Sequence, residues 1–317
     1  MGSSEAFRIE SLPEDDPARD EVLGLLLAEL GGPQQRAEGP IRRLTEYLER
    51  RSLRLTGLWG AYAGQRLVSA TMLIVSPGRL GAVHVPPGQP NETRARATVA
   101  LLDTLQRHAW DASLGMLQTL LTPEQNRWAM VFEQAGFGFL AELCYLDRKA
   151  DDPTPPVRRP TGLSFVTFGP ESRSLFLGVL EATYRDSLDC PRLAGIRRVE
   201  DVLATHQATG IFDPQSWQVA LIDGRPMGLL LLAAVRDRPL LEVVYMGVAP
   251  QARGRGVGDA IMARAVERTR QGDGKSLTLA VDSTNRPARD LYERWSFREL
   301  DRRRAWFVGR PGDLPQP

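Results

Sequence analysis

Residues 241–262 have the sequence LEVVYMGVAPQARGRGVGDAIM. The stretch begins with an apolar, β-branched run that predicts a buried strand ending near Val248. Pro250 ends the strand, because proline has no N–H for the ladder of hydrogen bonds. Glycines at 254, 256 and 258 follow, and apolar residues spaced as on one face of a helix begin at Ile261. The stretch therefore predicts a strand, a glycine-rich turn and a helix in immediate succession.

A strand, a glycine-rich turn and a helix N-terminus together form an arrangement that can hold phosphate. Glycines let backbone N–H groups converge, and the unpaired amides of the first helical turn carry partial positive charge. Arg253 and Arg255 add full charges. A P-loop would need Gly-Lys-Ser/Thr, but Asp259 follows Gly258, and the glycine spacing also differs from the dinucleotide fingerprint. An ordinary glycine-rich turn is the alternative.

Length and composition predict a soluble globular protein. A chain of 317 residues is long enough for two domains, and its 42% hydrophobic and 25% charged content is typical of such proteins. A net charge of +1 gives no field that would recruit nucleic acid, so we expect no nucleic-acid partner. The longest apolar run, residues 227–235, is too short to span a bilayer, so we expect no membrane association.

The cysteines and histidines give no pattern of a disulfide framework or of a metal site. Cys144 and Cys190 fall in different halves of the chain, which is typical of a reducing cytoplasm. The three histidines are scattered at positions 84, 108 and 206, so we expect no metal. The sequence does not begin with a secretory signal pattern. These features predict a cytoplasmic protein.

The chain predicts the same order of elements twice, which makes the fold class α/β (α+β). In the first half we expect strands at 6–9, 58–62, 67–75, 82–85, 116–121 and 139–146, and helices at 19–30, 40–51, 93–110 and 126–134. In the second half we expect strands at 163–168, 217–222, 226–235, 243–248, 276–281 and 306–308, and helices at 171–185, 199–208, 261–269 and 288–294.

Paired landmarks indicate a duplicated domain. Pro87 in the first half corresponds to Pro250 in the second, and Asn126-Arg127-x-Ala129 corresponds to Asn285-Arg286-x-Ala288 at nearly the same offset. The proline-rich segment 151–160 predicts a linker. We therefore expect a first domain at 1–150 and a second at 161–317, each with a mixed, mostly antiparallel sheet flanked by helices. Two unrelated α/β domains are the alternative.

A second motif, DSTNRPARDLYERWSF at 282–297, gives the chain its family resemblance. It resembles the Asn-x-x-Ala-x-x-Leu-Tyr-x-x-x-Gly-Phe pattern of the GNAT N-acetyltransferases, with Ser296 in place of glycine. The same family carries Arg/Gln-x-x-Gly-x-Gly/Ala, which Arg253, Gly256 and Gly258 match. Both motifs occur in the family's order and spacing. The second half thus resembles a GNAT domain, in tandem with a diverged first copy.

The resemblance implies an acyltransferase of the kind that moves groups other than aminoacyl groups, here an acetyl group passed directly from acetyl-CoA to the primary amine of a small-molecule acceptor. By the same resemblance, the groups that bind the co-substrate are the strand amides near Met246 and Val248, the turn, and Asn285. The turn residues are Arg253, Gly254, Arg255, Gly256, Val257 and Gly258. Asn285 is also well suited to cap a helix, and both roles are compatible.

Two side chains are the candidate catalytic groups. The resemblance implies that Tyr292 is the general acid that protonates the leaving thiolate; its alternative is a core tyrosine with a satisfied hydroxyl. Glu242, on the central strand, is the candidate general base, since partial desolvation at a strand end raises a carboxyl pKa. Its alternative is a strand-end surface charge.

The first copy lacks both the glycine-rich turn and the two candidate catalytic side chains. Residues 88–96 contain no glycine turn, and Pro90 removes an amide that phosphate would need. Arg79 takes the position of Glu242, and Phe132 or Glu133 that of Tyr292. We expect this copy to have no acetyl-CoA turnover and to be structural or to form one wall of the substrate cleft.

The acceptor is expected to lie against residues 183–192, where Tyr184 and Asp189 are the candidate substrate contacts and a solvated loop is the alternative. We do not expect Cys190 to be a nucleophile, because no histidine lies near it in sequence. The tandem architecture resembles that of the mycothiol synthases, which acetylate a sugar-linked cysteinyl amine. Two further interpretations are protein N-terminal or lysine acetylation and a non-catalytic acetyl-CoA sensor. The sequence carries no signal for an oligomeric state.

Overall fold

The computed structural model describes residues 6–27, 46, 48, 54–236, 238–272 and 274–312. The chain forms two compact units. The first consists of Met1–Leu140 together with Arg304–Pro317, and the second of Ala141–Arg303. The predicted helix at 40–51 and the last residues of the helix predicted at 19–30 fall almost entirely outside the described residues.

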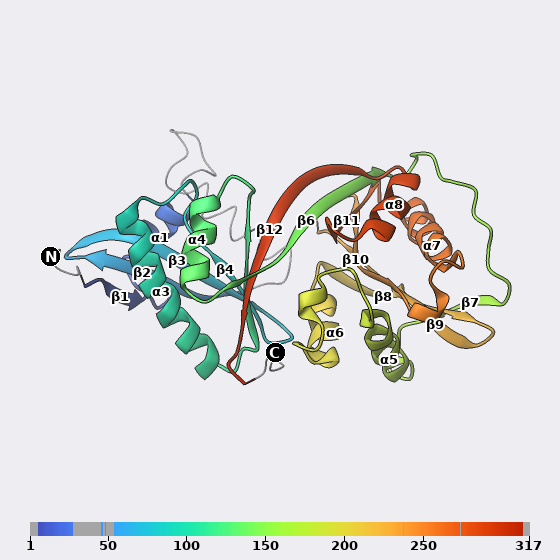
Figure 1. Cartoon of the computed structure of the whole chain (residues 1–317), viewed down its shortest axis with the longest axis horizontal. Coiled ribbons are helices and arrows are strands. Elements are labelled where there is room, and N and C mark those ends of the chain that lie inside the picture. The colour runs from blue at the N-terminus through green and yellow to red at the C-terminus, as the bar shows by residue number, and fades with distance from the viewer. Residues whose placement is uncertain are drawn as a thin grey trace. The chain divides into compact units, whose positions relative to one another are not determined.

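The first unit is a mixed sheet with helices on both faces (Figure 1). Its elements are β1 (Arg8–Ser11), α1 (Arg19–Leu26), β2 (Arg54–Ala63), β3 (Arg66–Ser76), β4 (Leu80–His84), α3 (Glu92–Asp111), β5 (Met116–Leu121) and α4 (Asn126–Gln134). The sheet runs in the order β1-β2-β3-β4-β5, and only the β4–β5 pair is parallel. Because side chains alternate along a strand, Leu73 packs under α3 and α4 while Met72 packs under α1.

The second unit has the same plan. Its elements are β7 (Leu163–Thr167), α5 (Arg173–Tyr184), α6 (Val199–Gln207), β8 (Ile211–Ile222), β9 (Arg225–Ala234), β10 (Leu240–Val248), α7 (Val257–Gln271), β11 (Ser276–Asp282) and α8 (Arg286–Arg294). The sheet order is β7-β8-β9-β10-β11, and only β10–β11 is parallel. Leu230 and Leu232 pack with α7 and α8, and Leu229 and Leu231 with α5 and α6. The predicted fold class, mixed and mostly antiparallel sheets flanked by helices, is confirmed.

Two long strands, β6 (Gly138–Lys149) and β12 (Arg298–Gly309), do not follow the predicted domain boundaries. Residues 143–149 of β6 pair with β11 in the second unit, and residues 304–309 of β12 pair with β5 in the first. Their apolar side chains agree with this pairing, since Leu146 belongs to the core of the second unit and Trp306 to that of the first. The compact units therefore differ from a division at 150 and 160. The division at 150 and 160 remains a prediction of where the two duplicated domains begin and end.

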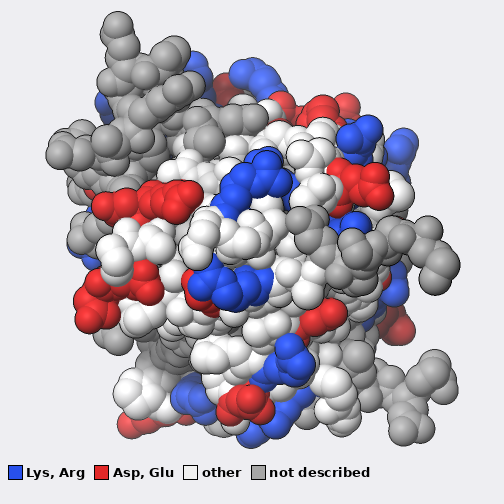
Figure 2. All heavy atoms as spheres, turned by 90° about the vertical axis from the view of Figure 1, so that its left-hand side faces the viewer, with Lys and Arg blue, Asp and Glu red and all other residues white. Residues whose placement is uncertain are grey.

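Basic and acidic side chains are mixed across the face that Figure 2 shows. Within the described ranges, no helix combines the length and apolar character that crossing a membrane requires. In the same residues, no group of three or more His, Cys, Asp or Glu side chains is arranged to hold a metal ion.

We predict that Trp306 stabilises the first unit although it lies near the end of the chain. Its side chain is 6% exposed and its ring lies 5.3 Å from that of Phe139. Trp306→Ala should cost about 3–5 kcal/mol of unfolding free energy, the usual range for a buried tryptophan. Hydrogen exchange of α3 and α4 amides measures this loss. The control is Leu300→Ala on the same strand, where the side chain is 66% exposed. This change should alter the free energy of unfolding by less than about 0.5 kcal/mol. A loss confined to the second unit would contradict the assignment of this strand.

Candidate functional site

A cavity of about 780 Å³ opens in the second unit beside β10. The registered pairing of β10 with β11 covers only Leu240–Glu242 against Ser276–Thr278, and the cavity wall begins beyond it with Val243 and Leu279. The other walls come from the segment after α5, from the glycine-rich turn and from α8. Of the predicted site residues, those that line the cavity are Asp189, Met246, Val248, Arg253, Gly254, Gly256, Gly258, Asn285 and Tyr292.

The glycine-rich turn has the predicted form, and its glycines serve different purposes. Gly254 and Gly256 have φ values of 72° and 77°, in the left-handed region that residues with a Cβ rarely adopt. Gly256 is the N-cap of α7. Gly258 is helical, and a Cβ there would lie 3.6 Å from Cδ2 of Leu291 and 3.9 Å from Cε of Met246. The missing side chain of Gly258 therefore leaves room in the cavity next to the first turn of α7.

Arg253 lies at the cavity, but its guanidinium is bonded to main-chain carbonyls. Nε donates to the carbonyl of Val248 (3.1 Å) and Nη1 to that of Asp186 (2.9 Å). Nη2 donates to the carbonyls of Arg185 (2.7 Å) and Thr183 (3.4 Å). This differs from the expectation that Arg253 supplies charge for phosphate.

The other two predicted turn residues do not line the cavity. Arg255 is exposed, and Val257 is buried in the core under α7. The turn therefore lines the cavity mainly with backbone atoms.

Tyr292 reaches the cavity from α8. Its side chain is 7% exposed, and its ring packs 5.5 Å from that of Phe297. Among the described residues, the hydroxyl makes no hydrogen bond. Burial raises the pKa of Tyr292, and the charges of Asp189 and Tyr245 act in the same direction. The phenol therefore stays protonated at neutral pH and can donate its proton.

Asn285 caps α8 and also faces the cavity. Its Oδ1 accepts a hydrogen bond from the amide of Ala288 at 3.4 Å, as a helix cap does. Its side chain also lowers the pKa of Asp189, so the two polar groups influence each other at the point where β11 leads into α8.

Asp189 is the predicted substrate contact that the structure brings to the cavity. Its Oδ1 accepts from the amide of Asp282 at 2.9 Å, and Oδ2 of Asp282 accepts from the amide of Cys190 at 3.2 Å. Burial raises the pKa of Asp189 and also that of the Cys190 thiol. A protonated thiol is a poor nucleophile, in agreement with the expectation for Cys190.

Tyr184 and Glu242 do not line the cavity. Tyr184 packs on Tyr245, with ring centroids 5.4 Å apart, and Tyr245 is the residue whose hydroxyl bonds to Thr183 at 2.8 Å and faces the cavity. Glu242 is partly buried on β10 opposite Ala233. Sequence reasoning missed Tyr245, although it lies in the central strand, because buried strands commonly carry aromatic residues.

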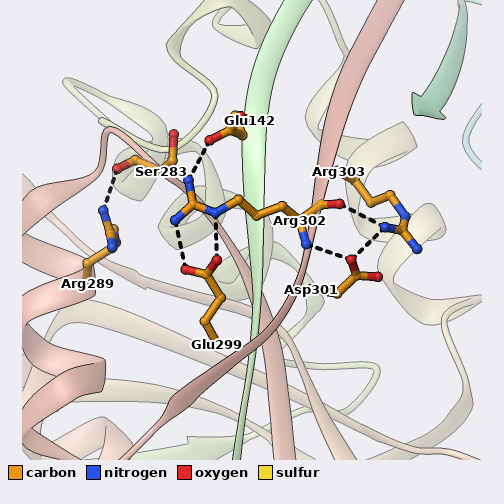
Figure 3. A network of polar contacts seen from close by, with 7 residues as sticks. All are labelled: Glu142, Ser283, Arg289, Glu299, Asp301, Arg302 and Arg303. Atoms are coloured by element: carbon orange, nitrogen blue, oxygen red, sulfur yellow. Dashed lines mark hydrogen bonds and ion pairs between the residues drawn. The ribbon is translucent and has the colours of Figure 1, made fainter. Parts of the chain in front are cut away.

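A polar network fixes the end of β11 to β6 (Figure 3). The amide of Ser283 donates to the carbonyl of Glu142 at 2.7 Å, and Arg289 on α8 donates to the carbonyl of Ser283 at 3.1 Å. The carboxylate of Glu142 accepts from Arg302 at 2.8 Å, and Arg302 also binds both carboxylate oxygens of Glu299 (Figure 3). The network holds the turn that carries Asn285.

The corresponding loop of the first unit is tied to α4 by side chains. The indole Nε1 of Trp128, a fully buried residue, donates to the carbonyl of Gly88 at 2.8 Å. Arg127 donates to the carbonyl of Pro90 at 3.4 Å, and Asn91 caps α3 through the amide of Arg94. This loop has its own partners where the second unit has a cavity.

Comparison with known proteins gives a consistent result. The profile described as "Acetyltransferase (GNAT) family" matches residues 180–297. The mycothiol acetyltransferase of Thermomonospora curvata is 30% identical over 222 residues, which cover 69% of this chain and 70% of that protein. The mycothiol acetyltransferase of Rhodococcus erythropolis is 32% identical over 165 residues, 49% of this chain and 54% of that protein.

Two solved structures share the fold. A GCN5-related N-acetyltransferase from Sphaerobacter thermophilus superposes with a TM-score of 0.60 at 18% identity, covering 96% of this chain and 95% of that one. The glucosamine N-acetyltransferase region of a fungal multi-domain β-N-acetylglucosaminidase gives 0.62 at 17% identity, covering 96% of this chain and 38% of that one. At these identities the likeness concerns the fold alone.

We predict that Gly258→Leu weakens coenzyme A binding without unfolding the protein. The backbone at 258 accepts a side chain, but leucine would extend toward Met246 and Leu291 and occupy the cavity. Calorimetric titration should show an affinity at least about 10-fold lower, the equivalent of 1.4 kcal/mol. The melting temperature should be unchanged or higher, because leucine favours helix more than glycine does. Gly178→Leu, at an exposed position of α5, is the control for helix propensity. Unchanged affinity would contradict the placement of coenzyme A beside α7.

Proposed function

Because this chain belongs to the GNAT acetyltransferase family, we propose that the cavity of its second unit is the place where acetyl-CoA and the primary amine of a small molecule meet. The chain is an N-acetyltransferase; the assignment of individual residues is our proposal. The observation that carries it is the position of Tyr292, a buried residue that lines the same cavity as the glycine-rich turn and whose hydroxyl makes no hydrogen bond to the described residues.

The turn fits the diphosphate of coenzyme A. Two glycines in left-handed conformation lead directly into the N-terminus of α7, where backbone amides lack partners and the helix dipole favours an anion. The space that Gly258 leaves open lies between this helix and Met246. In the proposed arrangement, the amides of the turn hold the diphosphate, and the main chain near Met246 and Val248 holds the acyl-bearing arm.

The proposed reaction is a direct transfer. The amine nitrogen forms a bond to the acetyl carbonyl carbon, and the bond from that carbon to sulfur breaks. The amine gives one proton to a base, and the sulfur receives one proton from the Tyr292 hydroxyl. Because burial raises the pKa of Tyr292, the phenol is protonated before the reaction, as a general acid must be.

Two carboxyl groups are candidates for the base. Side chains alternate along a strand, and Val243 packs toward α7 while Val244 and Tyr245 pack toward α5. Glu242 therefore lies on the α5 face, which is the side of the segment expected to bind the acceptor, and we propose that it acts through a water molecule. Asp189 is favoured by a different observation, since it lines the cavity and burial raises its pKa.

For the acceptor, we propose a sugar-linked cysteinyl amine. The support is the similarity to mycothiol acetyltransferases, which in the Thermomonospora curvata protein extends over two thirds of both chains. Asp186 and Asp189 on the cavity wall also suit a cationic amine. A cytoplasmic location belongs to the same proposal and is supported by the free thiols of Cys144 and Cys190.

We predict that Tyr292→Phe lowers kcat by about 10²-fold or more, the usual contribution of a general acid. Coenzyme A release with a panel of amines, including a cysteinyl glycoside and a lysine peptide, measures kcat, and titration should show acetyl-CoA affinity changed by less than about 3-fold. Tyr245→Phe makes the same chemical change on a cavity tyrosine that already bonds to Thr183 and should cost less than about 10-fold. Acetyl-CoA binding with no turnover of any amine would support a sensor instead.

The pH profile separates the two candidate bases. A base must be unprotonated, so kcat/KM falls as the pH drops through its pKa. If Asp189 is the base, this limb lies above the usual carboxyl range because burial raises its pKa, and Asp189→Asn abolishes the limb while Glu242→Gln keeps it. If Glu242 is the base, the two variants exchange these results. A limb that survives in both variants would contradict both assignments.

A further inference from the structure

The last two residues of α5 and the six that follow it, residues 183–190, form the cavity wall that we assign to the acceptor, and we call them the acceptor segment. Thr183, Asp186, Leu188 and Asp189 from this segment line the cavity. Two of its residues, Asp186 and Cys190, have φ values of 52° and 46°, in the left-handed region that non-glycine residues rarely adopt. Such a conformation persists only where the surroundings impose it.

The first anchor of the segment is Arg253. The last residue of α5 is Tyr184, so the carbonyls at its C-terminal end lack partners within the helix and carry partial negative charge. Arg253 bonds three of the carbonyls in this region, those of Thr183, Arg185 and Asp186. Its Nε bonds a fourth carbonyl, that of Val248 at the end of β10. One guanidinium thus joins the central strand to the acceptor segment.

The second anchor is Asp282 at the end of β11. Its carboxylate accepts from the amide of Cys190, and its amide donates to the carboxyl group of Asp189. Both anchors therefore come from elements that we assign to acetyl-CoA. Arg253 is the first residue of the glycine-rich turn, and Asp282 precedes the turn that contains Asn285.

We propose that Arg253 is a positioning residue that couples occupancy of the glycine-rich turn to the conformation of the acceptor segment. The inference rests on the proposed function, because the ligand of the turn is taken to be acetyl-CoA. A diphosphate held by the amides that follow Arg253 restricts the backbone from which the guanidinium extends. The hydrogen bonds to residues 183–186 transmit that restriction to the segment. By thermodynamic linkage, an ordered acceptor segment in turn raises the affinity for acetyl-CoA.

The alternative role for Arg253 is direct contact with phosphate, as its place in the motif suggests. The geometry is against it, since four of the N–H groups of the guanidinium already donate to carbonyls. The two roles predict different results. A phosphate ligand affects acetyl-CoA affinity, whereas a positioning residue affects the response of residues 183–190.

Hydrogen exchange of the full chain, with and without saturating acetyl-CoA, tests the coupling. In the wild type, acetyl-CoA should slow exchange of the amides of residues 185–190 by about 5-fold or more, the lower end of typical coupling. Arg253→Lys keeps the charge but loses the planar guanidinium group; this ligand-dependent slowing should disappear in it, and acetyl-CoA affinity should fall by no more than the same factor, as linkage requires. Arg270→Lys is the matched control, because Arg270 also donates to a main-chain carbonyl, that of Ala150. It should behave as the wild type.

The outcomes separate this inference from the proposed function. If acetyl-CoA does not bind the wild type, both are overturned. If it binds but does not slow exchange in residues 185–190, only the coupling is overturned, and no variant is needed for that result. Two results would make Arg253 an anion ligand. One is equal slowing of exchange in Arg253→Lys and the wild type; the other is a loss of acetyl-CoA affinity of about 10-fold with the slowing retained at saturation. A merely structural role would raise exchange equally with and without acetyl-CoA.

Discussion

The site depends on the point at which β10 and β11 stop pairing. Up to Glu242 and Thr278 the two strands form a parallel ladder; beyond them, residues of both strands line the cavity. The backbone of β10 remains paired with β9 as far as Val248, so the strand stays ordered while its other edge faces the cavity. Such an edge presents N–H and C=O groups to a ligand in extended form. The parting of two strands thus creates both the space and the hydrogen-bonding groups that an acyl donor needs.

Burial sets the protonation of the groups around this space. Burial raises the pKa of Tyr245 to about 12, and it also raises the pKa of Tyr292 and that of Asp189. At neutral pH the phenols are therefore proton donors rather than anions. The amide of Asp282 donates to Asp189 and, like the side chain of Asn285, lowers its pKa against the effect of burial. One cavity thus contains protonated phenols and a carboxyl group suited to accept a proton, as proton transfer in both directions requires.

The sequence predicted the local features well and the long-range contacts poorly. The strand, the glycine-rich turn and α7 follow from periodicity and from glycine's conformational freedom, and the cap at Asn285 from residue preference. The partners of β6 and β12 did not follow, because an alternating pattern identifies a strand but not its neighbour. Three of the four hydrogen bonds of Arg253 were missed because their acceptors are main-chain carbonyls some seventy residues away. Strict alternation would place Glu242 on the same face as Met246; the irregularity between Val243 and Tyr245 shifts it to the other.

The two units differ in more than the glycine-rich turn. In the paired motifs, Trp128 occupies the position of Pro287. Pro287 lines the cavity, whereas the indole of Trp128 is fully buried and bonds to Gly88 in the loop where phosphate would sit. A buried tryptophan contributes several kcal/mol of packing, so the loop that it secures has become part of the core. Restoring glycines to residues 88–96 would leave this indole in place. The side chain that follows the motif's arginine therefore lines a cavity in the second unit and is part of the core in the first.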